Sequence, residues 1–217
     1  MITVYAAYNV PPPVKGLVRD LRVIWALEEL GMAYGFHWMD IGKAEHRQEP
    51  NRAINPFGKI PSFSDGPVKL FETGAILHYL YEKAGKIPAD PARRGELLQW
   101  MFAALNTVEP PFLDIATWDA FWKDRPGRAV RYPELVEVAK TRLSELERGL
   151  GKKPFLLGDD FGPADILMTT ALNFARHQVA LFEHAPVAQA YLERCRSRPA
   201  YKTAVGKQGV GPKADAA

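Results

Sequence analysis

The chain of 217 residues has one cysteine, Cys195, and no serine before Ser62. A single cysteine forms neither an internal disulfide nor a Cys-x-x-Cys redox pair, which favours a reducing, cytoplasmic environment. No apolar run is long enough to cross a membrane. No basic region precedes an apolar stretch at the N-terminus, so a secretory signal is not expected either.

Positive and negative charges are nearly balanced in the sequence. The 28 lysines and arginines and the 25 acidic residues give a formal net charge of +3, and the two kinds are interspersed. Because nucleic-acid binding needs a clustered basic surface, nucleic acid is not expected as a partner. The five histidines show no convincing metal-ligand spacing, so no metal site is predicted.

The clearest motif is the run Asn-Pro-Phe-Gly-Lys-Ile-Pro at residues 55–61. A residue before a proline favours an extended backbone, and proline ends or borders a strand because it has no N–H to donate. The main chain of Ile60 is therefore predicted to be available for pairing with an extended ligand. A cis bond between Ile60 and Pro61 would fix a tight bend at this point.

A second motif, Glu72-Thr73, follows an expected strand and begins an apolar helix. The N-terminus of a helix carries unpaired N–H groups and partial positive charge, which suit a carboxylate. Alone, the pair would also fit simple helix capping, since threonine caps helices and an acid suits the dipole. Beside the Ile60-Pro61 segment, it predicts a site for a small acidic peptide.

Hydrophobic periodicity divides the chain into an α/β part over residues 1–84 and a helical part over 92–205. A Gly- and Pro-containing linker, 85–91, separates them, and 206–217 is expected to be a loose tail. The expected strands are 2–7, 34–40, 62–65 and 68–71, and the expected helices are 17–30, 45–52, 75–83, 96–108, 133–150 and 164–175. The fifth of these six is predicted to bury Leu135, Ala139, Leu143, Leu146 and Leu150, and the last to be central.

In this order the motifs resemble the cytosolic glutathione S-transferase family, in a bacterial-type form, over almost the whole chain. The resemblance rests on the helix segment 22–31, on 55–61, on Glu72-Thr73 where the family usually has Glu-Ser, and on 155–166. It implies an α/β N-terminal thioredoxin-like domain plus an all-α C-terminal domain.

The resemblance also implies glutathione as co-substrate. The main chain of Ile60, before Pro61, would pair with the cysteinyl unit. Glu72 would receive the γ-glutamyl amine and Thr73 the adjoining carboxylate. Lys59 would reach the glycyl carboxylate, although a solvated surface lysine fits the sequence equally.

The family places a Tyr, Ser or Cys after the first strand to stabilise the glutathione thiolate, and this chain has no Ser or Cys there. Tyr8 is the first choice for this catalytic role. Tyr5, Asn9, the Arg19 guanidinium and a backbone N–H remain alternatives. Tyr5 and Tyr8 would equally fit half-buried strand aromatics.

The implied function is conjugation of glutathione to hydrophobic electrophiles by a cytoplasmic homodimer acting in detoxification. A glutathione-dependent isomerase, dehalogenase or peroxidase is the alternative enzyme, and a non-catalytic binding module is the alternative of another class. The electrophile would bind between the domains, and the candidate wall residues are Trp100, Met101, Trp118, Phe121 and Trp122.

Overall fold

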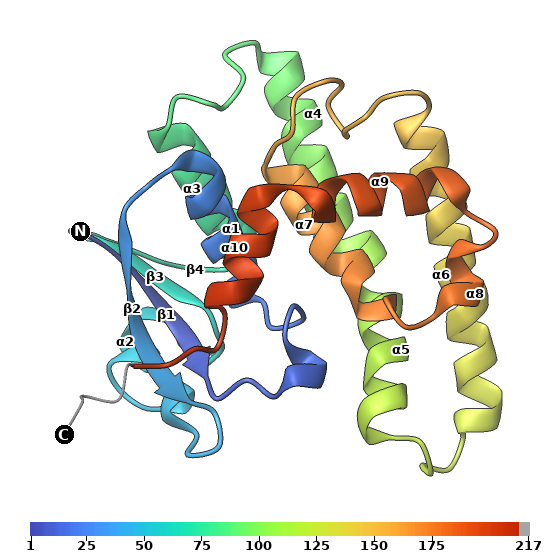
Figure 1. The fold of residues 1–217 in the computed structure, drawn as a ribbon, viewed down its shortest axis with the longest axis horizontal. Coiled ribbons are helices and arrows are strands. Elements are labelled where there is room, and N and C mark those ends of the chain that lie inside the picture. The colour runs from blue at the N-terminus through green and yellow to red at the C-terminus, as the bar shows by residue number, and fades with distance from the viewer. Residues whose placement is uncertain (213–217) are drawn as a thin grey trace. The chain divides into compact units, whose positions relative to one another are not determined.

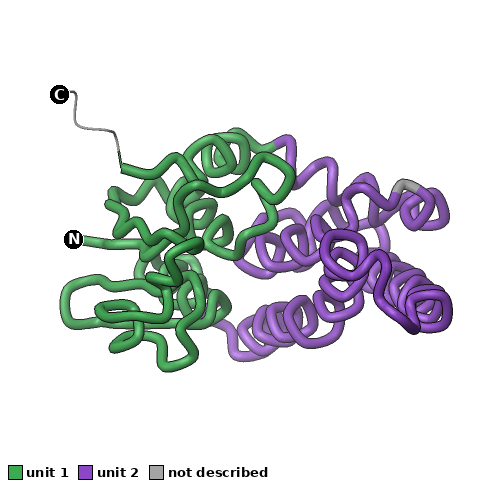
Figure 2. Tube along the Cα trace, turned by 90° about the horizontal axis from the view of Figure 1, so that it is seen from below, with its two compact units in different colours: residues 1–87, 198–217 green, residues 88–197 purple. Residues whose placement is uncertain are grey.

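The computed structural model describes residues 1–212 and divides the chain into two compact units (Figure 2). Unit 1 comprises Met1–Ile87 together with the residues from Arg198 onward, and unit 2 comprises Pro88–Ser197. Unit 1 contains a thioredoxin-like α/β sheet and unit 2 is helical, so the predicted fold class is confirmed. The last helix groups with unit 1, whereas the sequence assigned residues up to 205 to the helical domain.

The four strands of unit 1 form one mixed sheet in the order β2-β1-β3-β4. β1 and β2 are parallel, whereas β3 is antiparallel to both β1 and β4. The strands are β1 (Ile2–Tyr8), β2 (Tyr34–Asp40), β3 (Ser62–Asp65) and β4 (Val68–Phe71). The bounds of the last three are as predicted, because alternating apolar residues and the Asp65-Gly66-Pro67 turn mark them in the sequence.

The three helices predicted within residues 1–84 all differ from the structure in their bounds. α1 (Asp20–Leu30) starts three residues late, because turns occupy residues 15–19. The expected helix 45–52 is a 3-10 turn, Glu45–Arg47, followed by α2 (Asn51–Ile54). α3 (Thr73–Lys83) starts two residues early and includes Thr73 itself.

The last helix of unit 1, α10 (Pro199–Lys207), lies along α1 (Figure 1). The Arg198 guanidinium binds both carboxylate oxygens of Glu29, at 2.6 and 2.7 Å. The Tyr201 ring meets the ring of Trp25 edge-on at 4.8 Å between centroids. The prediction of a loose tail over 206–217 is wrong for its first residues, because residues 206 and 207 are helical and Gln208 is buried. Residues 213–217 lie outside the described residues.

Unit 2 contains a long helical passage that the sequence analysis ended too early. A helix over 96–108 is predicted, with Pro110-Pro111 just after it, but α4 (Pro91–Phe102) continues through a π-helical stretch, Ala103–Val108, into α5 (Glu109–Phe121). The Glu109 N–H bonds to the Ala104 carbonyl five residues back. The wider π turn places the prolines at the first positions of α5, where a missing N–H costs least.

The remaining helices of unit 2 are α6 (Arg128–Leu150), α7 (Pro163–Leu172), α8 (Val179–Phe182) and α9 (Pro186–Ser197). α6 begins five residues before the expected start at Pro133, which lies in its second turn. The five residues predicted on its apolar stripe are all buried.

α7 is buried at all ten positions, as its apolar sequence predicts. The buried Asp165 accepts hydrogen bonds from the N–H groups of Leu156 and Gly162 and from the hydroxyl of Tyr191, each at 2.9 Å. Burial raises the pKa of Asp165 to about 6 in spite of these donors. A side chain with this many buried partners fixes the start of the central helix.

Candidate functional site

Strand directions bring the predicted binding residues to one edge of the sheet. In the register, Tyr5 pairs with Ser62, and Ser62 pairs with Phe71. The segment that precedes β3, the residues that follow β4 and the end of β1 at Tyr8 therefore meet at the same edge. Ile60 belongs to the segment before β3, and Glu72 and Thr73 follow β4, so the fold brings Ile60 close to the Glu72-Thr73 pair. An extended ligand can reach all of them from this edge.

Two buried asparagines hold the segment 55–61. The Asn51 amide donates to the carbonyl of His46 at 2.7 Å and to that of Lys59 at 3.2 Å. The Asn55 amide also donates to the Lys59 carbonyl at 3.2 Å. The Ser62 hydroxyl donates to Asn51 Oδ1 at 2.6 Å. The bond between Ile60 and Pro61 is cis, as the sequence analysis considered.

The role of Asn51 was missed by the sequence analysis. Its side chain is fully buried although it lies in a four-residue helix next to exposed residues. A polar residue in a short, otherwise exposed helix gives little local signal, because its partners lie five to eleven positions away along the chain.

Glu72 stands at the N-terminus of α3 in an unusual backbone conformation, with φ +65° and ψ 116°. This region costs a residue with a Cβ about 1–3 kcal/mol, and such strain persists mainly where function or surrounding structure requires it. The side chain is exposed, and the Glu72 carbonyl accepts the first helical bond from Ile76 at 3.0 Å. The carboxylate is thus available to a ligand amine at the edge of the sheet.

Thr73, next to it, is 5% exposed and lies against a buried cation. Nη1 of Arg22, on α1, donates to Thr73 Oγ1 at 3.1 Å, and Arg22 is only 1% exposed. A hydroxyl can accept one hydrogen bond and donate another, so this contact leaves the Thr73 proton for an acceptor. The guanidinium and the N-terminus of α3 both make this point positive. The arrangement suits a ligand carboxylate that lies next to a ligand amine bound by Glu72.

Tyr8 ends β1 opposite Asp40 of β2. Its hydroxyl donates to Asp40 Oδ2 at 3.2 Å, so its one proton is directed at a carboxylate of the protein. Desolvation raises the pKa of Tyr8, and the neighbouring Asp40 carboxylate raises it further.

Lys59, the remaining predicted residue, has an exposed side chain. Its carbonyl accepts hydrogen bonds from the amides of Asn51 and Asn55.

The segment between β1 and α1, residues 9–19, contains a 3-10 turn, Pro12–Val14, and ends at Arg19, the N-cap of α1. Behind it lies the buried Asp20, whose carboxylate accepts from the Ala7 N–H at 3.0 Å. Burial raises the pKa of Asp20 to about 6, against hydrogen bonds from Gln208 and Ala7 that lower it. The N-terminus of α1 thus lies at the same edge of the sheet as Tyr8.

The five predicted wall residues divide into two groups. Met101 and Trp118 are buried, and the Trp100 ring covers Gly149 so closely that no side chain would fit there. Met101 and Trp118 therefore belong to the core of unit 2, and the partly exposed Trp100 ring packs against α6.

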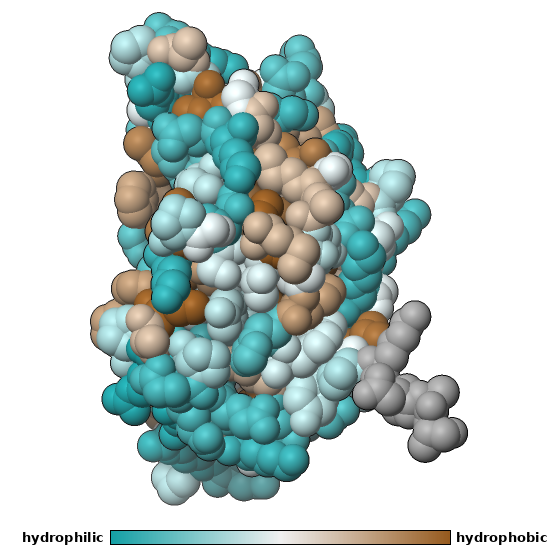
Figure 3. All heavy atoms as spheres, turned by 90° about the vertical axis from the view of Figure 1, so that its left-hand side faces the viewer, coloured by the Kyte–Doolittle hydropathy of each residue, from teal (hydrophilic) through white to brown (hydrophobic). Residues whose placement is uncertain are grey.

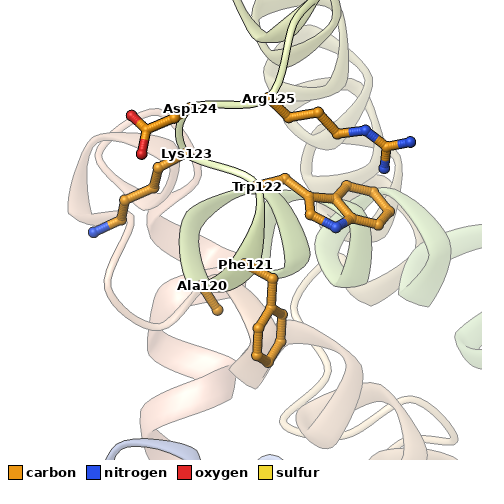
Figure 4. A pocket seen from close by; sticks show the side chains of 6 residues that line it. All are labelled: Ala120, Phe121, Trp122, Lys123, Asp124 and Arg125. Atoms are coloured by element: carbon orange, nitrogen blue, oxygen red, sulfur yellow. The ribbon is translucent and has the colours of Figure 1, made fainter.

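Phe121 and Trp122 differ from them, with 77% and 37% exposure. They line an open hollow of about 580 Å³ at the end of α5, where the Arg125 guanidinium lies 4.6 Å from the Trp122 ring centre (Figure 4). The residues at the sheet edge do not line this hollow.

Among residues 1–212, no three His, Cys, Asp or Glu side chains gather closely enough to hold a metal ion. No described helix is both long enough and apolar enough to cross a bilayer.

Comparison with known proteins gives matches over both units. The family model for the glutathione S-transferase N-terminal domain matches residues 15–82, and that for the C-terminal domain matches residues 108–199. The disulfide-bond oxidoreductase YfcG of Escherichia coli is 31% identical to this chain, over 88% of this chain and 91% of that protein. Glutathione S-transferase F9 of Arabidopsis thaliana is 29% identical, over 86% and 91% respectively.

Solved structures agree with these matches. A glutathione transferase of Burkholderia graminis, crystallised with two glutathione molecules per subunit, superposes with a TM-score of 0.82 at 27% identity. The superposition covers 97% of this chain and 89% of that one.

Proposed function

Because the chain belongs to the glutathione S-transferase family, we propose that it binds glutathione at the edge of the sheet and transfers its thiolate to small electrophilic compounds. The observation that carries the proposal is the convergence of Ile60, Glu72 and Thr73 at this edge. There a carboxylate and a positive helix start lie side by side, matching the amine and carboxylate of a γ-glutamyl group.

In the proposed complex, the Ile60 main chain pairs with the cysteinyl unit and Pro61 fixes the direction of that segment. The γ-glutamyl amine binds Glu72, and the adjoining carboxylate receives the Thr73 proton and the first N–H groups of α3. Lys59 lies on the same segment as Ile60 and binds the glycyl carboxylate.

Thiolate formation is assigned to the N-terminus of α1, through the Arg19 guanidinium or a backbone N–H of residues 9–19. A free thiol has a pKa of about 8.5, and each unit of depression requires about 1.4 kcal/mol of preference for the anion. A helix N-terminus and one charge-assisted hydrogen bond supply one or two units. Tyr8, the first choice from sequence, already donates its proton to Asp40.

The variant Tyr8→Phe tests this assignment. We expect the pKa of the bound glutathione thiol, followed by the ultraviolet absorbance of the thiolate, to change by less than about 0.3 unit. Tyr79→Phe is the matched control, since it also removes a tyrosine hydroxyl that donates to an aspartate, Asp65. A rise of about one unit or more in Tyr8→Phe alone would return the catalytic role to Tyr8.

For the electrophile, we propose contact with Phe121 and Trp122, whose rings are the most exposed of the five predicted wall residues. Exposed aromatic side chains bind apolar and aromatic compounds through contact with their rings.

A second candidate activity is reduction of small disulfides by glutathione. It is favoured by the 31% identity to a disulfide-bond oxidoreductase. Cys195 is fully buried and burial raises its pKa to about 12, so this chain offers no thiolate of its own. Two glutathione thiols would therefore supply both electrons: one disulfide is reduced to two thiols while glutathione disulfide forms.

One pair of assays separates the candidates. Turnover of an aromatic chloride with release of chloride supports the transferase, and reduction of a small disulfide supports the oxidoreductase. Glutathione binding without either reaction supports a binding module. A well-folded protein that binds no glutathione contradicts all three.

We also propose a homodimer, as the family resemblance implies. Phe57, on the segment 55–61, is 70% exposed, and apolar side chains gather in the middle of one face of the molecule (Figure 3). Light scattering is expected to give twice the mass of one chain. A mass equal to a single chain would contradict the dimer.

A further inference from the structure

The side chain of Gln208 is a buried connection between the C-terminal segment and the segment 9–19. It is 1% exposed, and its Oε1 accepts the Gly16 N–H at 2.6 Å. Its Nε2 donates to the Val18 carbonyl at 2.9 Å and also to the Asp20 carboxylate. An amide has two N–H donors, so both are used here, and the three partners cover the last turns before α1.

The backbone after Gln208 follows the same segment. Gly209 forms a bridge with Tyr8 at the end of β1. Its φ is +71°, and a Cβ at this position would lie 2.7 Å from Val10 Cβ and 2.9 Å from Val10 Cγ2. Only glycine combines this conformation with such a close approach. Gly211, with φ +80°, lies less closely against Tyr8, where a Cβ would lie 3.3 Å from Tyr8 Cβ.

Ion pairs fix the C-terminal segment from the other side. Arg198 binds Glu29 through two hydrogen bonds at the beginning of α10, and Lys207 binds Glu28 at 2.6 Å at its end. Both glutamates are on α1. They lie near its C-terminal end, whereas Gln208, directly after α10, bonds at its start. The C-terminal segment therefore contacts both ends of the helix whose N-terminus faces the proposed thiolate.

We propose that Gln208 is a positioning residue for thiolate formation. It acts through residues 9–19: by holding Gly16 and Val18, it fixes the N–H groups and Arg19 at the N-terminus of α1. This inference rests on the proposed function, because it assigns thiol activation to that segment. Glutathione binding itself depends on Ile60, Glu72 and Thr73, which Gln208 does not contact in the described bonds.

The test uses Gln208→Met in the full chain, because methionine fills a similar volume without the three hydrogen bonds. We expect the thiol pKa of bound glutathione to rise by about 0.5 unit or more and kcat to fall about 3-fold or more at pH 6.5, in proportion to the lost thiolate. The Kd for glutathione should change less than about 3-fold. A purely structural role would lower stability without moving the thiol pKa.

Gln189→Met is the matched control, because Gln189 is exposed on α9 and its side chain donates to Glu193, one turn further along the same helix. Gly209→Ala is the second variant. It leaves the Gln208 side chain in place but presses on Val10, so it should also raise the thiol pKa, and it keeps the test valid where Gln208→Met does not fold.

An unchanged thiol pKa and an unchanged kcat in a folded variant of either kind would overturn the proposal. Different results contradict the proposed function and the role of Gln208. Wild-type protein that binds no glutathione contradicts the proposed function and this inference together. Wild-type protein that binds and turns over glutathione, with variants that match it, contradicts this inference alone.

Discussion

The Glu72→Ala variant is expected to bind glutathione about 30-fold or more weakly than the wild type. The exposed Glu72 carboxylate is the proposed partner of the γ-glutamyl amine, and a hydrogen bond between charged groups contributes about 1.5–3 kcal/mol. Isothermal titration calorimetry measures the change. Loss of retention on immobilised glutathione should accompany it.

A second substitution at this position tests the backbone strain of Glu72 together with its carboxylate. Glycine adopts φ +65° readily, so Glu72→Gly should relieve about 1 kcal/mol or more of strain while it removes the same carboxylate. Binding should therefore weaken while stability rises. Glu82→Ala, near the other end of α3 and exposed, is the control. If glutathione binding is retained in both Glu72 variants, the carboxylate has no role in recognition.

The Asn51→Ala variant should lower the free energy of unfolding by about 2–4 kcal/mol. Asn51 is fully buried and joins the His46 carbonyl, the Lys59 carbonyl and the Ser62 hydroxyl. Its removal leaves these groups short of a buried partner, which costs more than the bonds themselves contribute. Chemical denaturation measures this loss.

The same variant should also weaken glutathione binding, because Asn51 holds the segment that presents Ile60. Gln48→Ala, an exposed amide in the preceding turn, is expected to change neither quantity appreciably. Equal stability of Asn51→Ala and Gln48→Ala would show that the asparagine bonds do not hold the segment.

Features with a local sequence signal were predicted well. β2, β3 and β4 have the predicted bounds because strand alternation and a Gly-Pro turn mark them. The stripe from Leu135 to Leu150 follows from helical periodicity alone. The continuation of the helix through Pro110-Pro111 was not predicted, because the π turn that accommodates the prolines has no recognisable pattern.

Features that depend on distant partners could not be read from the sequence. Gln208 bonds to Gly16 across 192 positions, and Arg22 bonds to Thr73 across 51. The sequence around Gln208 or Arg22 does not indicate which distant residue each side chain will contact. A glutamine in a Gly-rich terminal stretch indicates a loose tail by composition, and only the fold shows it buried. The competing partner of Tyr8, Asp40, likewise follows from strand pairing rather than from local sequence.

Calorimetric titration of the wild-type protein with glutathione tests the central claim most directly. A single type of site with a Kd below about 1 mM is predicted, and Glu72→Ala should raise that Kd about 30-fold or more. Well-folded wild-type protein that releases or absorbs no heat with glutathione up to about 10 mM would contradict the account.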